Sequence, residues 1–212
     1  MTSRLFILRH HPSFPDPEIA PERDALNCIR VLTRILPYVY EKESLQDWED
    51  RFFWSVRRKR TRQSVLASEV LFDEADEEEA AAAARKQQNA EEFEDAKPLA
   101  EELIDTLIDL LFFSDLTVAR QPHGKPKVSY TIWQSGVGCN TAVPTTKEFE
   151  NNRCEILRLL LTLASRSMYT SANALPQTGV KALTYICSCP DKQVVLSLLC
   201  SLLNTVSSIS TP

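Results

Sequence analysis

Leucines at helical spacing are the feature that most constrains the fold of this chain. Residues 98–113 show it best, because one face of the segment is apolar and the opposite face is acidic. The apolar stripe is Leu99, Leu103, Leu107, Leu110 and Leu111, and the acidic face is Glu101, Glu102, Asp105 and Asp109. Pro98 suits the first turn, where a missing backbone donor costs nothing. This pattern predicts an amphipathic helix over 98–113.

Three other segments have the same period. Residues 22–40 predict a helix that Asp24 can cap and that Pro37 should kink or end near Arg34 to Leu36. Thr145 with Glu148 forms a capping box, which predicts a helix from there to about residue 169, buried on most sides over 156–164. A last helix is predicted over 190–207. Residues 114–145 are irregular, with a small hairpin possible between 116–119 and 128–133.

Long apolar helices joined by loops, without convincing strands, predict an all-α protein. We interpret it as an α-solenoid or armadillo-like helical stack. The helices centred on Leu107, Leu160 and Leu199 look alike, but their spacing is not constant, so no sequence repeat is inferred. A stack needs polar caps at its ends, and the last helix has none. We therefore expect the chain to be an N- and C-terminally incomplete part of a longer protein.

The acidic charge is concentrated in one stretch of the chain. The formal net charge is −5, yet residues 73–109 alone carry 3 basic and 14 acidic side chains. A basic cluster, Arg57 to Arg60 with Arg62, precedes this stretch, and a run of five alanines, Ala80 to Ala84, lies inside it. Such a composition buries too little apolar surface to offset the entropy of ordering. We predict a disordered or weakly helical insertion, in which the acidic run neutralises the basic cluster.

This pattern divides the chain into one helical domain and its appendages. The predicted parts are a disordered N-terminal segment 1–21, a helical segment 22–56, the charged insertion 57–96, a second helical segment 97–207 of the same domain with the irregular loop 114–145, and a tail 208–212.

Composition also limits the function. A sequence pI near 5.3 argues against generic nucleic-acid binding, and no uncharged apolar run reaches the length of a membrane span. Six cysteines are present, and Cys28, Cys154, Cys187 and Cys200 fall in apolar helical segments, which predicts buried, reduced thiols. Only Cys187 and Cys189 are close together, so no metal site and no cofactor is predicted.

No catalytic motif is present, so enzymatic activity is not predicted. The aromatic side chains Phe52, Phe53, Trp54 and Trp133 are the candidate site residues, as fillers of a core or of a partner groove. Three Leu-x-x-Leu-Leu boxes, Leu107–Leu111, Leu157–Leu161 and Leu199–Leu203, are interpreted as core packing rather than as docking motifs.

Several blocks of sequence resemble the high-temperature-induced dauer-forming protein family. They are residues 27–41, with Leu32, Thr33, Arg34, Leu36 and Pro37, and then 52–55, 97–101, 110–112, 115–118, 132–138, 152–161 and 201–206, in this order. The ordered array is specific, whereas any single block would be weak. The charged insertion resembles a fungal elaboration.

The resemblance implies a non-enzymatic, peripheral membrane protein on the cytosolic face of the Golgi and trans-Golgi. Such a scaffold acts in protein sorting and in secretory vesicle traffic, with proteins of the secretory pathway as its partners and no nucleic acid. Animal members of the family use an N-terminal myristoylated glycine, whereas this chain has Thr2 at that position.

Two alternatives stay open. One is a nuclear or cytosolic adaptor that uses Arg57 to Arg62 and a leucine box. The other is an enzyme without a recognisable motif, built around Cys139 and the loop from Trp133 to Gly138.

Overall fold

The structure is a computed structural model that describes the chain except for residues 61–92, 121–126, 131–136, 138–144, 174–178 and 210–212. Its helices are α1 (Thr2–His10), α2 (Glu22–Glu41), α3 (Gln46–Phe53), α5 (Leu99–Leu111), α6 (Lys147–Ala164), α8 (Lys181–Cys187) and α9 (Lys192–Ile209). Short 3₁₀ turns, η1 (Glu43–Leu45) and η4 (Ser165–Tyr169), precede α3 and follow α6. Two strands, β1 (Arg57–Arg60) and β2 (Phe93–Ala96), form a small ladder.

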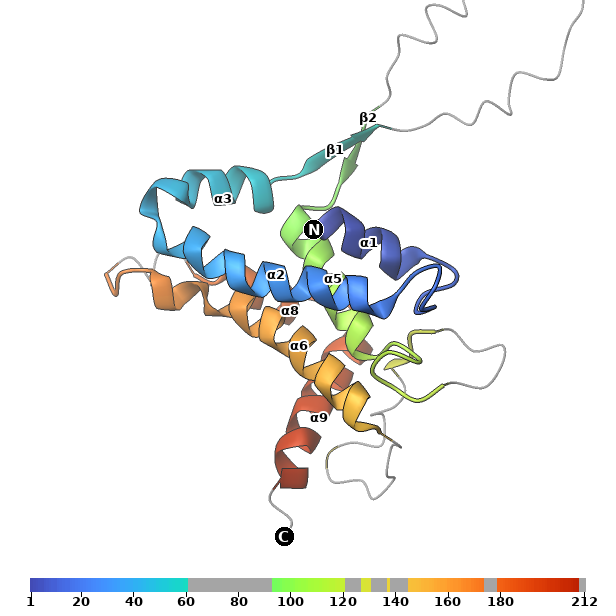
Figure 1. The fold of residues 1–212 in the computed structure, drawn as a ribbon. Coiled ribbons are helices and arrows are strands. Elements are labelled where there is room, and N and C mark those ends of the chain that lie inside the picture. Colours follow the sequence, from blue (N-terminus) through green and yellow to red (C-terminus); the bar gives the residue numbers. More distant parts are fainter. Residues whose placement is uncertain (61–92, 121–126, 131–136, 138–144, 174–178, 210–212) are drawn as a thin grey trace, which may run out of the picture.

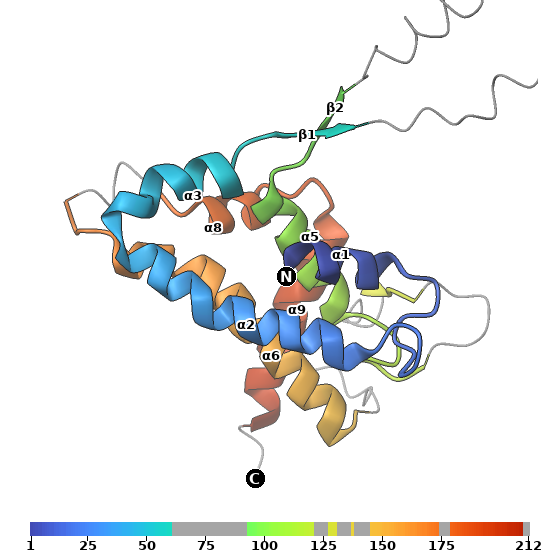
Figure 2. The ribbon, with the colours of Figure 1, turned by 45° about the horizontal axis from the view of Figure 1, so that its top comes forward.

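Helices α2 and α6 lie side by side and run in the same direction (Figure 1). Their first turns line one cleft, and the rings of Tyr40 and Tyr169 meet at their far ends, 5.6 Å apart. Helix α5 lies behind this pair and contacts α1, α6 and α8, as the turned view also shows (Figure 2). The described residues therefore confirm a mostly helical protein. The solenoid stack stays a prediction.

Helix α5 forms the centre of the core. Its predicted leucine stripe is buried, and so are Ala100, Ile104, Thr106 and Ile108 on its other sides. The acidic face is only half exposed, because its carboxylates are paired: Asp105 with Lys97, and Asp109 with Arg9. A helix buried nearly all round is typical of the middle of a layered helical protein.

The predicted disorder of residues 1–21 is wrong. Helix α1 buries Leu5, Phe6 and Leu8, and Phe14 is fully buried with its ring 5.1 Å from that of Phe113. Arg9 also donates to Asp109. The segment is short and has little amphipathic pattern, so its order comes from contacts with residues about 100 positions away, which the local sequence does not reveal.

Pro37 does not end α2, which was one of the two predicted effects of this residue. The helix continues to Glu41 with Pro37 inside it, and Leu36 and Tyr40 on either side are buried. Burial of these side chains outweighs the lost backbone hydrogen bond. Asp24 does not cap α2 either, because Pro21 is at the N-cap and Asp24 pairs with Arg4 instead.

The ends of the charged insertion are ordered, which the sequence did not predict. Arg57–Arg60 pairs antiparallel with Phe93–Ala96, and the ladder places Arg58 opposite Asp95 and Lys59 opposite Glu94. The opposite charges of Arg58 and Asp95, which face each other across the ladder, stabilise it. The remainder of the insertion, 61–92, lies outside the described residues.

The long helix α6 was predicted with small errors. It begins one residue late, since Thr146 is the N-cap and its hydroxyl accepts from the Phe149 backbone N–H. Ile156, Leu159 and Leu163 are buried as expected, but Leu161 is 69% exposed. In the irregular loop, the described residues form two isolated bridges, Phe113 with Val128 and Ser114 with Val118, in place of a hairpin.

Candidate protein-interaction surfaces

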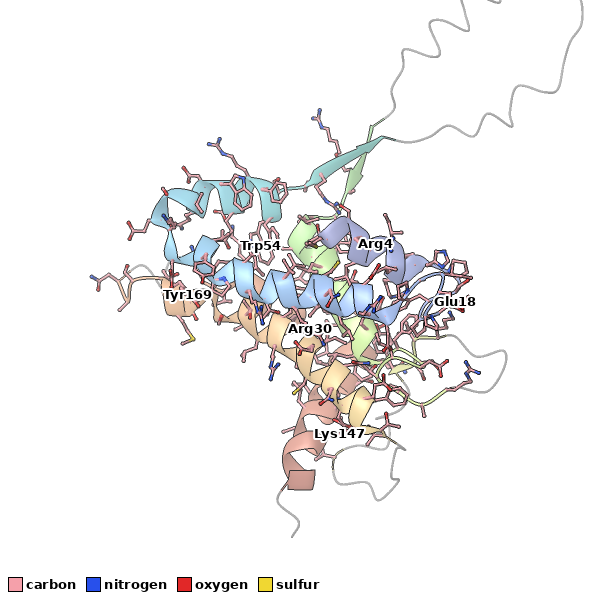
Figure 3. The ribbon with its side chains drawn as sticks, in the orientation of Figure 1. Arg4, Glu18, Arg30, Trp54, Lys147 and Tyr169 are labelled. Atoms are coloured by element: carbon pink, nitrogen blue, oxygen red, sulfur yellow. The ribbon has the colours of Figure 1, made fainter. Side chains whose placement is uncertain are left out.

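The predicted aromatic residues have three different positions. Phe53 is buried in the core, and Trp54 is partly buried against it, at the end of α3 (Figure 3). Phe52 is 52% exposed and stacks on Trp48 with a ring separation of 4.9 Å. Trp133 lies outside the described residues. The aromatic block is thus divided between core packing and a solvent-facing pair.

Two ion pairs join α3 to other elements, and one of them is on its buried inner face. Glu49 is buried, and its carboxylate accepts from Arg166 Nε at 2.9 Å. The Arg166 guanidinium also lies 5.3 Å from the centre of the Tyr40 ring. Asp50 accepts from Lys181 Nζ at 2.6 Å. Because η4 and α8 contribute these ion pairs, α3 is held in place by elements that are distant in sequence.

The outer face of α3 carries the exposed aromatic pair. Trp48 is 46% exposed, and the two rings are nearly parallel. Large aromatic side chains on a fixed helix lose little conformational entropy on binding, and tryptophan is enriched among residues that dominate binding energies. We define Trp48 and Phe52 as the aromatic pair. Phe52 is one of the predicted site residues, whereas Trp48 was not predicted as one, and both side chains are available to a partner.

A second candidate surface is on α9. Leu196, Leu199, Leu202 and Leu203 are between 37% and 54% exposed, on one face of the helix. The opposite face is buried and includes Ser197, Leu198, Cys200 and Ser201. The third leucine box was interpreted as core packing. That interpretation is wrong, because all three of its leucines face solvent. The second box is divided: Leu160 is buried, whereas Leu161 is exposed.

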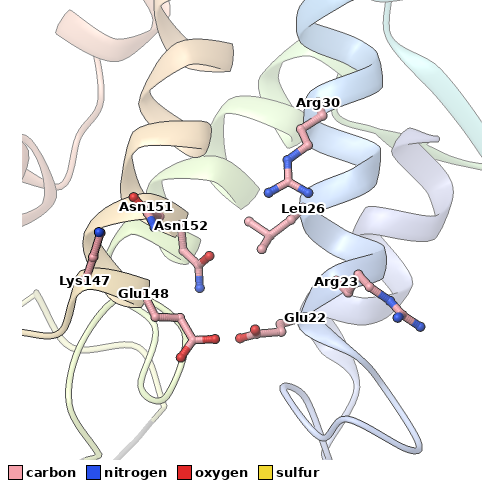
Figure 4. A pocket seen from close by; sticks show the side chains of 8 residues that line it. All are labelled: Glu22, Arg23, Leu26, Arg30, Lys147, Glu148, Asn151 and Asn152. Atoms are coloured by element: carbon pink, nitrogen blue, oxygen red, sulfur yellow. The ribbon is translucent and has the colours of Figure 1, made fainter.

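A polar cleft of about 520 Å³ lies between the first turns of α2 and α6. The carboxylates of Glu22 and Glu148 point toward each other across it, while Arg30 lies over Leu26 (Figure 4). Burial and the facing Glu148 raise the pKa of Glu22. The cleft therefore favours the protonated form of Glu22 more than water does. In the described part of the chain, no group of three or more potential metal ligands comes together.

A smaller cavity of about 270 Å³ lies between α5, α8 and α9. Its polar side chains are already paired: Tyr185 donates to Asp105 at 2.9 Å, and Tyr130 donates to Asp109. Burial and the bond to Asp109 raise the pKa of the Tyr130 hydroxyl. Because each carboxylate is satisfied within the fold, these pairs join α5 to its neighbours and leave no group poised for chemistry.

The described cysteines only partly follow the prediction. Cys28 and Cys200 are buried, and burial raises the pKa of the Cys28 thiol. Cys154 and Cys187 are exposed, which contradicts the expectation that they are core residues. They lie on the exposed sides of α6 and α8. Cys139, the candidate nucleophile, lies outside the described residues.

No single helix among the described residues is long and apolar enough to cross a membrane. Helix α8 and the first part of α9, Lys192–Leu203, pass the same test of length and composition only as a pair, with a bend of 112° between them.

The fold and its surfaces define a helical protein that presents apolar contact faces on fixed helices. The chain belongs to the Hid1 family, described as high-temperature-induced dauer-formation protein, whose match covers residues 1–211. This confirms the family resemblance found in the sequence.

The curated relatives include fungal and animal proteins. The Ubp5-interacting protein ftp105 of Schizosaccharomyces pombe is 35% identical over 97% of this chain and 27% of its own length. Protein HID1 of mouse is 35% identical, and that of human 34%, each over 85% of this chain and 21% of its own length. The chain thus spans about a quarter of these relatives. None of these names describes an enzyme, and no solved structure matches the chain.

Proposed function

We propose that this chain is a non-enzymatic helical scaffold, peripheral to Golgi and trans-Golgi membranes, that acts in protein sorting and secretory vesicle traffic through protein contacts. Membership of the Hid1 family supports the cellular role that the resemblance implies. The yeast relative's name, Ubp5-interacting protein, supports a role in binding proteins.

The exposed aromatic pair on α3 is the observation that carries the proposal. Trp48 and Phe52 stack on each other in solvent, although the inner face of the same helix is fixed by the Glu49–Arg166 ion pair. A soluble fold gains nothing from exposing two large rings together, whereas a rigid aromatic pair suits a binding centre. We propose that it contacts a protein partner of the secretory pathway.

Imaging of the tagged chain beside a trans-Golgi marker tests the location. We expect the two signals to coincide, and we expect cargo to be missorted in a strain that lacks the gene. A diffuse cytosolic or nuclear signal would contradict the location, and a deletion strain that sorts its cargo normally would contradict the role in sorting.

The double variant Trp48→Ala/Phe52→Ala tests the contact surface. Removing an aromatic binding centre costs about 2 kcal/mol or more, so partner recruitment and Golgi localisation should fall by more than tenfold. Met168→Ala is the matched control, because Met168 is 83% exposed and lies outside α3, in η4. Both proteins should keep the helical circular dichroism of the parent. Unchanged localisation and sorting in the double variant would exclude the aromatic pair as the contact.

A further inference from the structure

Helix α9 presents its more apolar face to solvent. The exposed face consists of Leu196, Leu199, Leu202 and Leu203, whereas the buried face includes Ser197 and Ser201. In folded proteins the buried face of a helix normally carries leucine rather than serine, because removing apolar surface from water is favourable. We define these four side chains as the leucine face.

The leucine face also lacks charge. No Asp, Glu, Lys or Arg occurs in α9 after Lys192. Helices α2 and α6 differ, since their exposed sides carry Arg23, Arg30 and Arg34, and Lys147 and Arg158 respectively. An uncharged, contiguous apolar face on an exposed helix marks a surface that packs against another protein segment. The C-terminal end of α9 also extends away from the body formed by α2, α5 and α6 (Figure 1). This leaves room for a neighbouring helix.

The length of the relatives indicates which segment could cover the leucine face. The chain matches only 27% of the fission-yeast relative and 21% of mouse HID1, so most of each relative lies outside the matched region. We propose that the leucine face packs against an uncharged, leucine-lined helix from that remaining part of a Hid1-family protein. This proposal rests on family membership and on the leucine face, and it does not depend on the Golgi role.

Cysteine labelling in two proteins tests the proposal. Leu199→Cys is made in this chain, and a cysteine is placed at the aligned position of full-length ftp105. Maleimide modification at that position is then followed by mass spectrometry. Ile7→Cys and its aligned counterpart are the matched control, because Ile7 lies on α1 and is 59% exposed, close to the 52% of Leu199.

We expect rapid labelling of Leu199→Cys in this chain and labelling at least tenfold slower at the aligned position of full-length ftp105, each measured relative to its control. Equal relative rates in the two proteins would overturn the proposal. Slow labelling in this chain together with a dimeric mass would overturn it in favour of a second copy. Protection that appears only when liposomes are added would overturn it in favour of a membrane.

A charge on the leucine face gives an independent measurement. Leu203→Asp should leave the unfolding midpoint of this chain unchanged, because the side chain is 53% exposed. The equivalent change in full-length ftp105 should lower its midpoint, because the carboxylate would be buried without a partner. An unchanged midpoint in full-length ftp105 would contradict the proposal.

Discussion

At the scale of single residues, the ion pair between Glu49 and Arg166 is more buried than the second ion pair of α3, Asp50 with Lys181. The side chains are 8% and 19% exposed, so neither charge is well solvated. Arg166→Met should lower the free energy of unfolding by about 3–5 kcal/mol, because Glu49 is left buried without its partner. Arg4→Ala, which breaks a pair that is 50% and 37% exposed, should cost less than about 1 kcal/mol. Urea unfolding measures the free energy of unfolding of both variants. Equal losses in the two variants would contradict the prediction that the buried pair matters more than the exposed one.

The carboxyls of Glu22 and Glu148 predict a pH dependence. Burial first, and then Glu148, raise the pKa of Glu22 above its ordinary value of 4.5. The folded state therefore binds this proton more tightly than the unfolded state, and the resulting stability is present below pH 4.5 and lost as the pH rises through the folded pKa. Glu22→Gln should be more stable than the parent at pH 7 but not at pH 4.

Thermal unfolding of Glu22→Gln at the two pH values is the measurement. Glu18→Gln is the control, because Glu18 is an exposed loop residue, and it should show no such difference between pH 7 and pH 4. A Glu22→Gln variant that follows the parent at both pH values would show that the two carboxyls do not interact.

At the scale of elements, substitutions in α1 test whether the N-terminal segment packs on the rest of the fold. Leu5 is fully buried between α1 and the core, so Leu5→Ala should cost about 2–5 kcal/mol. Ile7 is on the same helix but is 59% exposed, and Ile7→Ala should change the free energy of unfolding by less than about 0.5 kcal/mol. Equal effects in urea unfolding would mean that α1 is not docked.

At the scale of the whole molecule, the charged insertion should be dispensable for folding. Arg60 and Phe93 lie opposite each other at the end of the ladder, so a four-residue Asn-Gly-containing turn can replace residues 61–92. Shortening the loop in this way should raise the free energy of unfolding by up to about 2 kcal/mol through loop entropy alone. A loss of more than about 1 kcal/mol in urea unfolding would show that the removed residues stabilise the domain.

Long helices with a strong apolar period could be predicted from the sequence. The period sets which side of α2 and α6 is buried, and the threonine capping chemistry places the start of α6 to within one residue. The prediction of an all-α protein therefore depended on local information. The family could also be recognised from ordered blocks of sequence, because relatives keep those blocks in the same order.

Tertiary structure decided the features that depend on distant contacts. Helix α1 is ordered because Leu5 and Phe14 meet α5 and Phe113, and α2 passes Pro37 because Leu36 and Tyr40 are buried. Distant contacts also decide which aromatic side chains of α3 are buried. Glu49 pairs with Arg166 and Phe53 packs in the core, so Trp48 and Phe52 on the other side of the helix face solvent. A local pattern can show that a face is apolar, but only the packed fold decides whether that face meets another helix, as α5 does, or meets solvent, as the leucine face of α9 does.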